Sequence, residues 1–424
     1  MVVYVLNKHG KPLMPCHPAK ARILLKQGKA KVIQRTPFTI KLLYRCSGYK
    51  QPVTLGVDSG YKYIGLSAIT DKRELFSAEV ELRSDISRLL QKRKEYRRGR
   101  RNRLWYRKPR FLNRGRSEGW LPPSIQHKLD SYIRLVKKVA KILPVSKVVV
   151  EVAAFDIQKI KNPSISGVEY QNGEQKGFWN VREYVLYRDG HTCRLCKNKT
   201  KNKVLEVHHL IPRNKGGTDK PDNLITLCRT CHKLIHEKGM EYDLLKRFNP
   251  PMQFKAETFM TTVRWKIVNK LKELGYEVSH TYGYITKCMR ISLGLEKTRY
   301  HDAFCIAGGK DQKRLGYFYF IKQVRRQNRS LYKAKLLKGG KRKVNTIKEA
   351  FGFRRFDKVS YNGIECFIYA LRTKGYFDLR KLDGEKISPS VSYKKLRLLE
   401  RAKTFLIERK PQLLPAVNDR VSAA

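Results

Sequence analysis

The stretch VTLGVDSGYKYIGLSAIT, residues 53–70, carries the strongest fold signal in the chain. Apolar residues alternate from Val53 to Val57, which is the period-two pattern of a strand with one buried face. A turn follows at Ser59-Gly60, and a second apolar run returns from Ile64 to Ala68. The stretch therefore predicts a buried β-hairpin that carries an acid, Asp58, at the end of its first strand.

Two further acids stand at the borders of apolar segments. Glu151 ends the run Val148-Val149-Val150, and Asp302 lies where an apolar helix begins, in HDAFCIA. A single acid after an apolar run is more often a turn or helix-cap residue. Buried acids are costly unless a cation binds them, and carboxylates around two divalent ions, about 3.5–4 Å apart, can clamp a phosphodiester. Asp58, Glu151 and Asp302 would supply such ligands if one sheet brings them together.

A Cys/His-rich module lies between the second and third acids. Cys193-x-x-Cys196 and Cys228-x-x-Cys231 have the spacing of a four-thiolate structural zinc site. They bracket LEVHHLIPRNKGGTDKPDNLITLC, residues 205–228, which contains His208-His209 and Asn223, and His232 follows the last cysteine. A zinc ribbon that only binds is the alternative, but such a module does not require these additional residues.

Charge defines the class of partner. Lys and Arg total 92 against 36 Asp and Glu, a formal net charge of +56 spread along 424 residues. Such a chain requires a polyanion. Hydrophobic residues at 41% and aromatic residues at 10% are enough to fill a core and exclude a disordered basic protein. Composition alone leaves a ribosomal or chromatin protein open.

Compartment follows from the absence of two signals. No apolar run approaches the ~20 residues of a membrane span, and the first residues lack a signal-peptide pattern. Nine cysteines, four of them in the two pairs, indicate metal binding and reduced thiols. We expect a soluble intracellular protein.

The Cys/His module resembles the HNH nuclease family, which has a ββα-metal fold. That resemblance implies that His209 is the general base and that His208 and His232 hold a catalytic magnesium ion. It also implies that Asn223 fixes the loop beside the base. His236, one turn beyond His232, is a candidate helper.

Three strings resemble the RuvC motifs in order: GVDSGYKYIGLSA, KVVVEVAAFD and YHDAFCIAGG. With the HNH module between the second and third, the order resembles the IscB family of transposon-encoded nucleases guided by an omega RNA. The resemblance includes Pro12-Leu13-Met14-Pro15 near the start. It implies Asp58, Glu151 and Asp302 as magnesium ligands and His301 as a candidate catalytic residue. Many such sites have a histidine where this chain has Arg299.

The implied fold is a multidomain α/β protein with an RNase H-like (RuvC) core split in three. An inserted ββα-metal HNH domain, a small N-terminal α/β domain, an Arg-rich bridge helix and a C-terminal β-rich domain complete it. The expected boundaries are 1–52 for the N-terminal PLMP-type domain, 53–82, 117–165 and 249–312 for the RuvC segments, 83–116 for the bridge helix, 166–248 for the HNH domain and 313–424 for the C-terminal domain.

The bridge helix would grip the guide RNA, because guanidinium groups pair with phosphates in a bidentate way. The alternative is a solvated basic helix. Its candidate nucleic-acid-binding residues are Arg93, Arg97, Arg98, Arg100, Arg101, Arg103 and Arg107.

The C-terminal end is expected to be β-rich, with a helical segment from Tyr393 to Phe405. It would read a short DNA motif that flanks the target. The candidates for contacts with base edges are Arg354, Arg355, Arg372 and Lys374.

We therefore expect an RNA-guided double-strand DNA endonuclease that acts as a monomer in a ribonucleoprotein. The resemblance implies that HNH cuts the guide-paired strand and RuvC the displaced strand. It also implies a cytoplasmic prokaryotic protein that is associated with the nucleoid when bound to DNA. One alternative is a guide-independent transposon-associated or structure-specific nuclease that uses the same carboxylates. Another is a non-catalytic RNA-binding protein with a structural zinc module.

Overall fold

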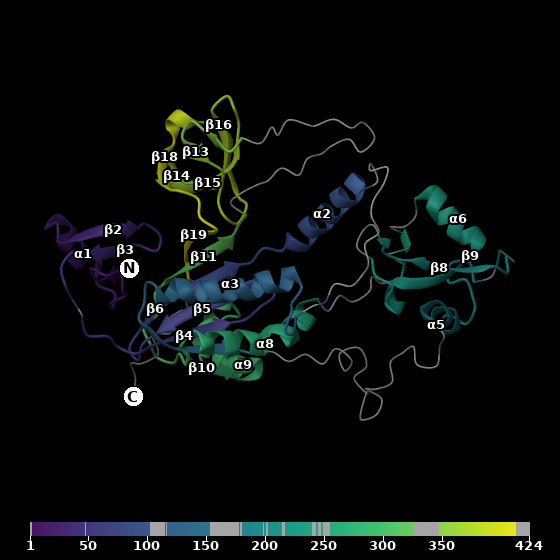
Figure 1. Cartoon of the computed structure of the whole chain (residues 1–424), viewed down its shortest axis with the longest axis horizontal. Coiled ribbons are helices and arrows are strands. Elements are labelled where there is room, and N and C mark those ends of the chain that lie inside the picture. Colours follow the sequence, from purple (N-terminus) through teal and green to yellow (C-terminus); the bar gives the residue numbers. More distant parts are fainter. Residues whose placement is uncertain are drawn as a thin grey trace, which may run out of the picture. The chain divides into compact units, whose positions relative to one another are not determined.

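The computed structural model describes residues 2–46, 48–101, 115, 117–152, 178, 180–197, 199–200, 202–213, 217–239, 243–244, 247–248, 255–325 and 347–412. The chain divides into two compact units (Figure 1). The first combines Met1–Ala154 with Phe259–Ala424, and the second is Phe155–Thr258. Within the described ranges, no helix is long and apolar enough to cross a membrane.

A small sheet with one helix opens the first unit. Its strand order is β1-β3-β2, and β1 and β3 are parallel. The helix begins at Pro18. Proline suits this position, because the amide hydrogen that it lacks would have no partner within the helix there. The bounds are β1 Tyr4–Leu6, α1 Pro18–Lys26, β2 Ala30–Gln34 and β3 Thr39–Leu42.

A seven-stranded mixed sheet forms the centre of the first unit. The order is β10-β7-β4-β5-β6-β11-β19, in which β10, β7 and β4 are parallel neighbours. The predicted hairpin is β4 paired with β5. The strands are β4 Val53–Asp58, β5 Tyr63–Ile69, β6 Glu74–Glu81, β7 Val145–Glu151, β10 Glu277–Thr281, β11 Tyr317–Gln323 and β19 Phe405–Pro411.

Helices cover both faces of this sheet. On one face, α3 (Pro123–Ala140) and α8 (Lys255–Glu273) share a core cluster with Val53, Leu55 and Val57. Because side chains alternate along a strand, Gly56 and Asp58 point to the opposite face. There α10 (Arg299–Ile306) contacts β4 and β5, and α9 (Gly283–Ser292) contacts α10.

Two glycines let α10 lie directly on the sheet backbone. A Cβ atom at Gly56 would overlap the carbonyl oxygen of Ala303, and one at Gly65 would overlap that of Arg299. Gly65 is also the residue opposite Asp58 in the β4 and β5 pairing. The close approach therefore brings the first turn of α10 beside the end of β4.

The basic segment after β6 begins as the predicted helix. Helix α2 spans Ile86–Arg101. Most of the residues that follow it up to 116 lie outside the described ranges.

A five-stranded antiparallel sheet follows β11, with order β17-β16-β15-β14-β18. The elements here are β12 Glu349–Ala350, β13 Phe353–Arg354, β14 Lys358–Tyr361, β15 Ile364–Leu371, β16 Tyr376–Arg380, β17 Lys386–Ser392, the 3₁₀ helix η4 Tyr393–Lys395 and β18 Arg397–Glu400. Strands β11 and β19, expected in the C-terminal domain, pair within the central sheet instead.

The predicted helix from Tyr393 to Phe405 is wrong. The segment forms η4 and β18, and Phe405 begins β19. Its apolar spacing suits a helix, but Leu398 lies opposite Val359 in an antiparallel pairing with β14. Tertiary pairing here overrides local propensity.

The second unit is a hairpin with helices. Strands β8 (Leu205–His209) and β9 (Leu224–Cys228) are antiparallel, and β9 leads directly into α6 (Arg229–Lys238). The other elements are α5 Val181–Arg188 and the 3₁₀ helix η3 Pro221–Asn223. A ββα arrangement is present, as the Cys/His module predicts.

We predict that Gly65→Ala destabilises the first unit by ~1–3 kcal/mol. The added Cβ atom would overlap the carbonyl oxygen of Arg299, which belongs to the backbone of α10 and cannot rotate away. Thermal unfolding measures the loss. Gly115→Ala is the control, because nothing lies within 4 Å of that position. Equal stability of the two variants would contradict the close packing of α10.

Candidate nuclease centres

Three acids predicted from the sequence meet at one edge of the central sheet. Asp58 ends β4 and Glu151 ends β7, and these strands are parallel neighbours with Val57 opposite Val150. Asp302 lies in the first turn of α10, which covers this face. The fold thus gathers carboxylates that are separated by long stretches of sequence.

The electrostatics of the three acids indicate crowding in a poorly solvated site. Burial raises the pKa of Asp58 to about 7, Arg299 opposes the shift, and Glu151 and Asp302 add to it. Burial also raises the pKa of Glu151, with a hydrogen bond from Thr286 opposing and Asp302 adding. The pKa of Asp302 is raised by burial, although Arg290 and Arg299 oppose this. A cation bound among them would relieve the repulsion.

Two arginines and a threonine hold these carboxylates. Nη1 of Arg299 lies 3.1 Å from Oδ2 of Asp58, and Nε of Arg290 lies 3.0 Å from Oδ1 of Asp302. The hydroxyl of Thr286 donates to Oε2 of Glu151 at 2.8 Å. Each acid therefore keeps a defined orientation.

A fourth acid lies near this group. Glu79 on β6 is opposite Gly65, which is itself opposite Asp58. Burial raises the pKa of Glu79, and Arg299 opposes the shift. Arg299 thus interacts with acids on both sides of Gly65, an arrangement that the sequence alone did not reveal.

His301 does not join the acids at an accessible surface. Its side chain is fully buried, and its Nδ1 lies 2.9 Å from the carbonyl oxygen of Glu296. The ring lies edge-on to Tyr300. These contacts are those of a packed ring, and the catalytic role of His301 stays a prediction.

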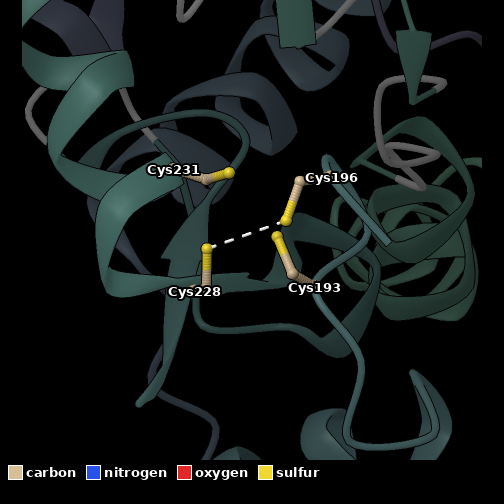
Figure 2. Close-up of side chains that lie close together, drawn as sticks. All are labelled: Cys193, Cys196, Cys228 and Cys231. Carbon is tan, nitrogen blue, oxygen red and sulfur yellow. Dashed lines mark hydrogen bonds between the residues drawn. The ribbon is translucent and has the colours of Figure 1, made fainter. Parts of the chain in front are cut away.

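In the second unit, the four paired cysteines converge. Figure 2 shows the side chains of Cys193, Cys196, Cys228 and Cys231 pointing toward one another. The sulfur atoms all lie within 4.8 Å of one another, and those of Cys196 and Cys228 are 3.8 Å apart. Tetrahedral Zn–S bonds of about 2.3 Å imply sulfur separations of about 3.8 Å. The four thiols fit a structural zinc ion.

Three histidines form a second group that could hold a metal ion. Candidate ligand atoms of His208, His232 and His236 lie within 4.8 Å of one another. Nδ1 of His232 lies 2.8 Å from Oε2 of Glu206. Burial lowers the pKa of His232, Glu206 opposes this, and His236 adds to it. A lowered pKa favours the neutral imidazole that binds metals.

His209 follows His208 at the end of β8, where successive residues face opposite sides of the strand. Its Nε2 lies 2.8 Å from Oδ1 of Asp219, and Arg213 contacts the same oxygen. Hydrogen bonds from His209 and then Arg213 lower the pKa of Asp219. An ionised carboxylate orients the imidazole, leaving Nδ1 available as a proton acceptor.

Asn223 fixes the chain around this pair. It is fully buried, and its Oδ1 accepts from the amide of Ile211 at 2.9 Å. Its Nδ2 donates to the carbonyls of Ile211 and Thr218 at 3.0 and 2.8 Å. Asn223 therefore links the end of β8 to the residue that precedes Asp219.

The predicted nucleic-acid-binding arginines are only partly described. Arg93, Arg97, Arg98 and Arg101 are exposed on α2. The side chain of Arg100 and the residues Arg103 and Arg107 lie outside the described ranges. Arg290, Thr286 and Asp219 were not evident from the sequence. His236 was predicted only as a candidate helper, although its spacing of four from His232 places both on one helix face.

Two protein families match parts of the chain. Residues 193–238 match the family HNH endonuclease, and residues 3–173 match the family RRXRR protein. Over 72 residues the chain is 36% identical to the Type IV methyl-directed restriction enzyme EcoKMcrA of Escherichia coli (strain K12), covering 16% of this chain and 26% of that enzyme. The chain thus spans about a quarter of that relative.

A second relative is anaredoxin of Nostoc sp. (strain PCC 7120 / SAG 25.82 / UTEX 2576). It is 32% identical over 64 residues, which are 15% of this chain and 82% of anaredoxin. A crystal structure of Streptococcus thermophilus Cas9 in complex with the AGAA PAM aligns with a TM-score of 0.29 at 14% identity, covering 44% of this chain and 26% of that one. A TM-score of 0.29 does not establish that the two chains share a fold.

The ββα arrangement, the histidine group and the matched residues agree with one another. The chain therefore carries an HNH endonuclease domain at residues 193–238, and its residues 3–173 match the RRXRR family.

Proposed function

We propose that the protein is an RNA-guided DNA endonuclease of the IscB type with two nuclease centres. The observation that carries this proposal is the meeting of Asp58, Glu151 and Asp302 at one sheet edge, in a chain that carries an HNH domain between the second and third acids. A second phosphodiester-cleaving site would explain why a chain with an HNH domain also gathers buried carboxylates.

The three acids fit divalent magnesium, because hard oxygen ligands suit that ion and burial raises the pKa of each acid while no cation is bound. Such ions would activate water and stabilise both oxygens of the phosphodiester. Asp58, Glu151 and Asp302 would hold them. Thr286 would keep Glu151 oriented, and Arg299 would neutralise Asp58 until a cation binds.

At the HNH centre His209 would accept the proton of the attacking water at Nδ1, because Asp219 is aligned with Nε2. His208, His232 and His236 would hold the metal ion. Imidazole ligands also suit borderline transition ions, so this centre should accept ions other than magnesium. The four cysteines would bind structural zinc.

Charge supports nucleic acid as the partner. The +56 net charge and the exposed arginines of α2 suit an RNA backbone. By resemblance, base pairing would read the target, HNH would cut the guide-paired strand, and the carboxylate centre would cut the displaced strand. In the C-terminal sheet, Arg354 is paired with Glu349, whereas Lys374 is exposed and available for flanking DNA.

A guide-independent nuclease remains the second candidate, since 72 residues of the chain are 36% identical to part of a restriction enzyme. The carboxylate centre would then act on a DNA structure or a fixed site. The two candidates differ in whether protein without RNA cuts DNA.

The first test uses the RNA that copurifies with the protein. Sequencing identifies its guide segment, and a plasmid that carries the matching sequence becomes the substrate. We expect magnesium-dependent double-strand cleavage by the wild type, opposite single-strand nicks by Asp58→Asn and His209→Ala, and no cleavage by the double variant. Equal cutting of unmatched DNA, or by RNA-free protein, would favour the second candidate.

Zinc removal should affect one centre only. Cys228→Ser removes a buried thiolate of the cysteine group, so we expect loss of bound zinc and of guide-paired-strand nicking. Displaced-strand nicking should survive, because its residues lie in the other unit. Cys288→Ser, at an exposed free cysteine, is the control. Unchanged zinc content in Cys228→Ser would contradict the assignment.

Asp58→Asn should also stabilise the metal-free protein at pH 8. The folded pKa of Asp58, about 7, lies above its unfolded value, so this group's contribution to stability falls as pH rises between the two. The neutral amide removes that penalty, with an expected gain of up to ~4 kcal/mol, about 1.4 kcal/mol for each of roughly three pKa units, that disappears near pH 4.

The matched control for this measurement is Glu74→Gln. That buried carboxylate lies 2.8 Å from Nε of Arg314, so its loss should destabilise the protein. Chemical denaturation at both pH values measures the difference. Destabilisation of the metal-free protein by Asp58→Asn at pH 8 would contradict the crowded site.

A further inference from the structure

Four exposed aromatic side chains form a continuous group on the first unit. The aromatic patch comprises Trp265 of α8, His280 of β10 and the two residues Tyr282 and Tyr284. Successive ring centroids lie 5.1, 5.7 and 6.2 Å apart, and the two tyrosine rings are stacked with planes only 10° apart. Trp265 is 43% exposed, Tyr282 42% and Tyr284 69%.

The aromatic patch borders the carboxylate centre. Thr281 lies opposite Glu151 in the parallel pairing of β10 and β7, and Tyr282 follows it directly. A Cβ atom at Gly283 would lie 3.4 Å from Oε1 of Glu151. Because α9 begins at Gly283 and its Thr286 donates to Glu151, the two tyrosines flank the backbone position that lies beside Glu151.

The surroundings of the patch suit a polyanion better than an apolar partner. Lys287 is exposed one turn after Gly283, and Lys266 follows Trp265. The Cζ atom of Arg264 lies 6.0 Å from the Trp265 ring centroid. Exposed aromatic rings beside cations are the combination with which proteins hold single-stranded nucleic acid, since every base has a face that can stack.

We propose that the aromatic patch binds bases of single-stranded DNA and thereby presents the neighbouring phosphodiester to the carboxylate centre. This inference rests on the proposed function, because it assigns the substrate of that centre. A duplex keeps its bases stacked inside, so the patch selects an unpaired strand. Trp265, Tyr282 and Tyr284 are in this account substrate-binding residues, separate from the acids.

Binding provides a direct test. The full-length Asp58→Asn protein, purified with its RNA, is titrated with a short deoxythymidine oligonucleotide that carries one 2-aminopurine. We expect quenching on binding and a Kd raised ~10-fold or more when Tyr282→Ala and Tyr284→Ala are added together. The Tyr→Phe pair should keep the affinity, because it retains the rings. Tyr49→Ala, at an 83% exposed tyrosine elsewhere, is the control.

Cleavage separates this inference from the proposed function. In the guide-matched plasmid assay, with wild-type Asp58, the double alanine variant should slow displaced-strand nicking ~10-fold while guide-paired-strand nicking is unchanged. If Asp58→Asn leaves displaced-strand nicking intact, the proposed function fails. If Asp58→Asn abolishes it but the alanine pair changes neither rate nor affinity, only the aromatic-patch inference fails. Equal loss of nicking at both strands also overturns the aromatic-patch inference, and so does slower nicking with unchanged affinity for the oligonucleotide.

Discussion

The direct contact between α10 and the backbone of β4 and β5 is the constraint on which the carboxylate centre depends. Side chains at positions 56 and 65 would hold the helix away from the sheet, and glycine at both allows backbone to meet backbone. Asp302 then lies beside Asp58, while the parallel pairing of β4 and β7 brings Glu151 to the same edge. The same contact positions Arg299 over Asp58.

Two chemically different centres occur in the two units of the chain. The first offers carboxylate oxygens on a sheet that is stabilised by a large apolar core. The second offers imidazoles on a small hairpin and helix, whose own core cluster includes three of the four paired cysteines. Because so small a core provides little stability, a metal-bound cysteine group would stabilise that unit. The two centres can therefore lose function separately.

Much of the fold was predictable because its signals are local. The alternation around Asp58 gave the β4 and β5 hairpin, and the cysteine spacing predicted a group that the structure brings together. Interactions between distant segments were not predictable: Arg299 with Asp58, Arg290 with Asp302, and the return of β19 to the central sheet. The prediction of a helix from Tyr393 to Phe405 was wrong for the same reason. The burial of His301 also depends on neighbours from its surroundings, such as Tyr300.

The central claim is that the three acids form one cation-binding centre. Anomalous diffraction from crystals of the protein soaked in manganese tests it most directly. We predict manganese peaks bounded by Asp58, Glu151 and Asp302, with Arg299 withdrawn from Asp58, and no such peak in Asp58→Asn crystals. Ordered density for the acids without any manganese between them, or acids far apart from one another, would contradict the account.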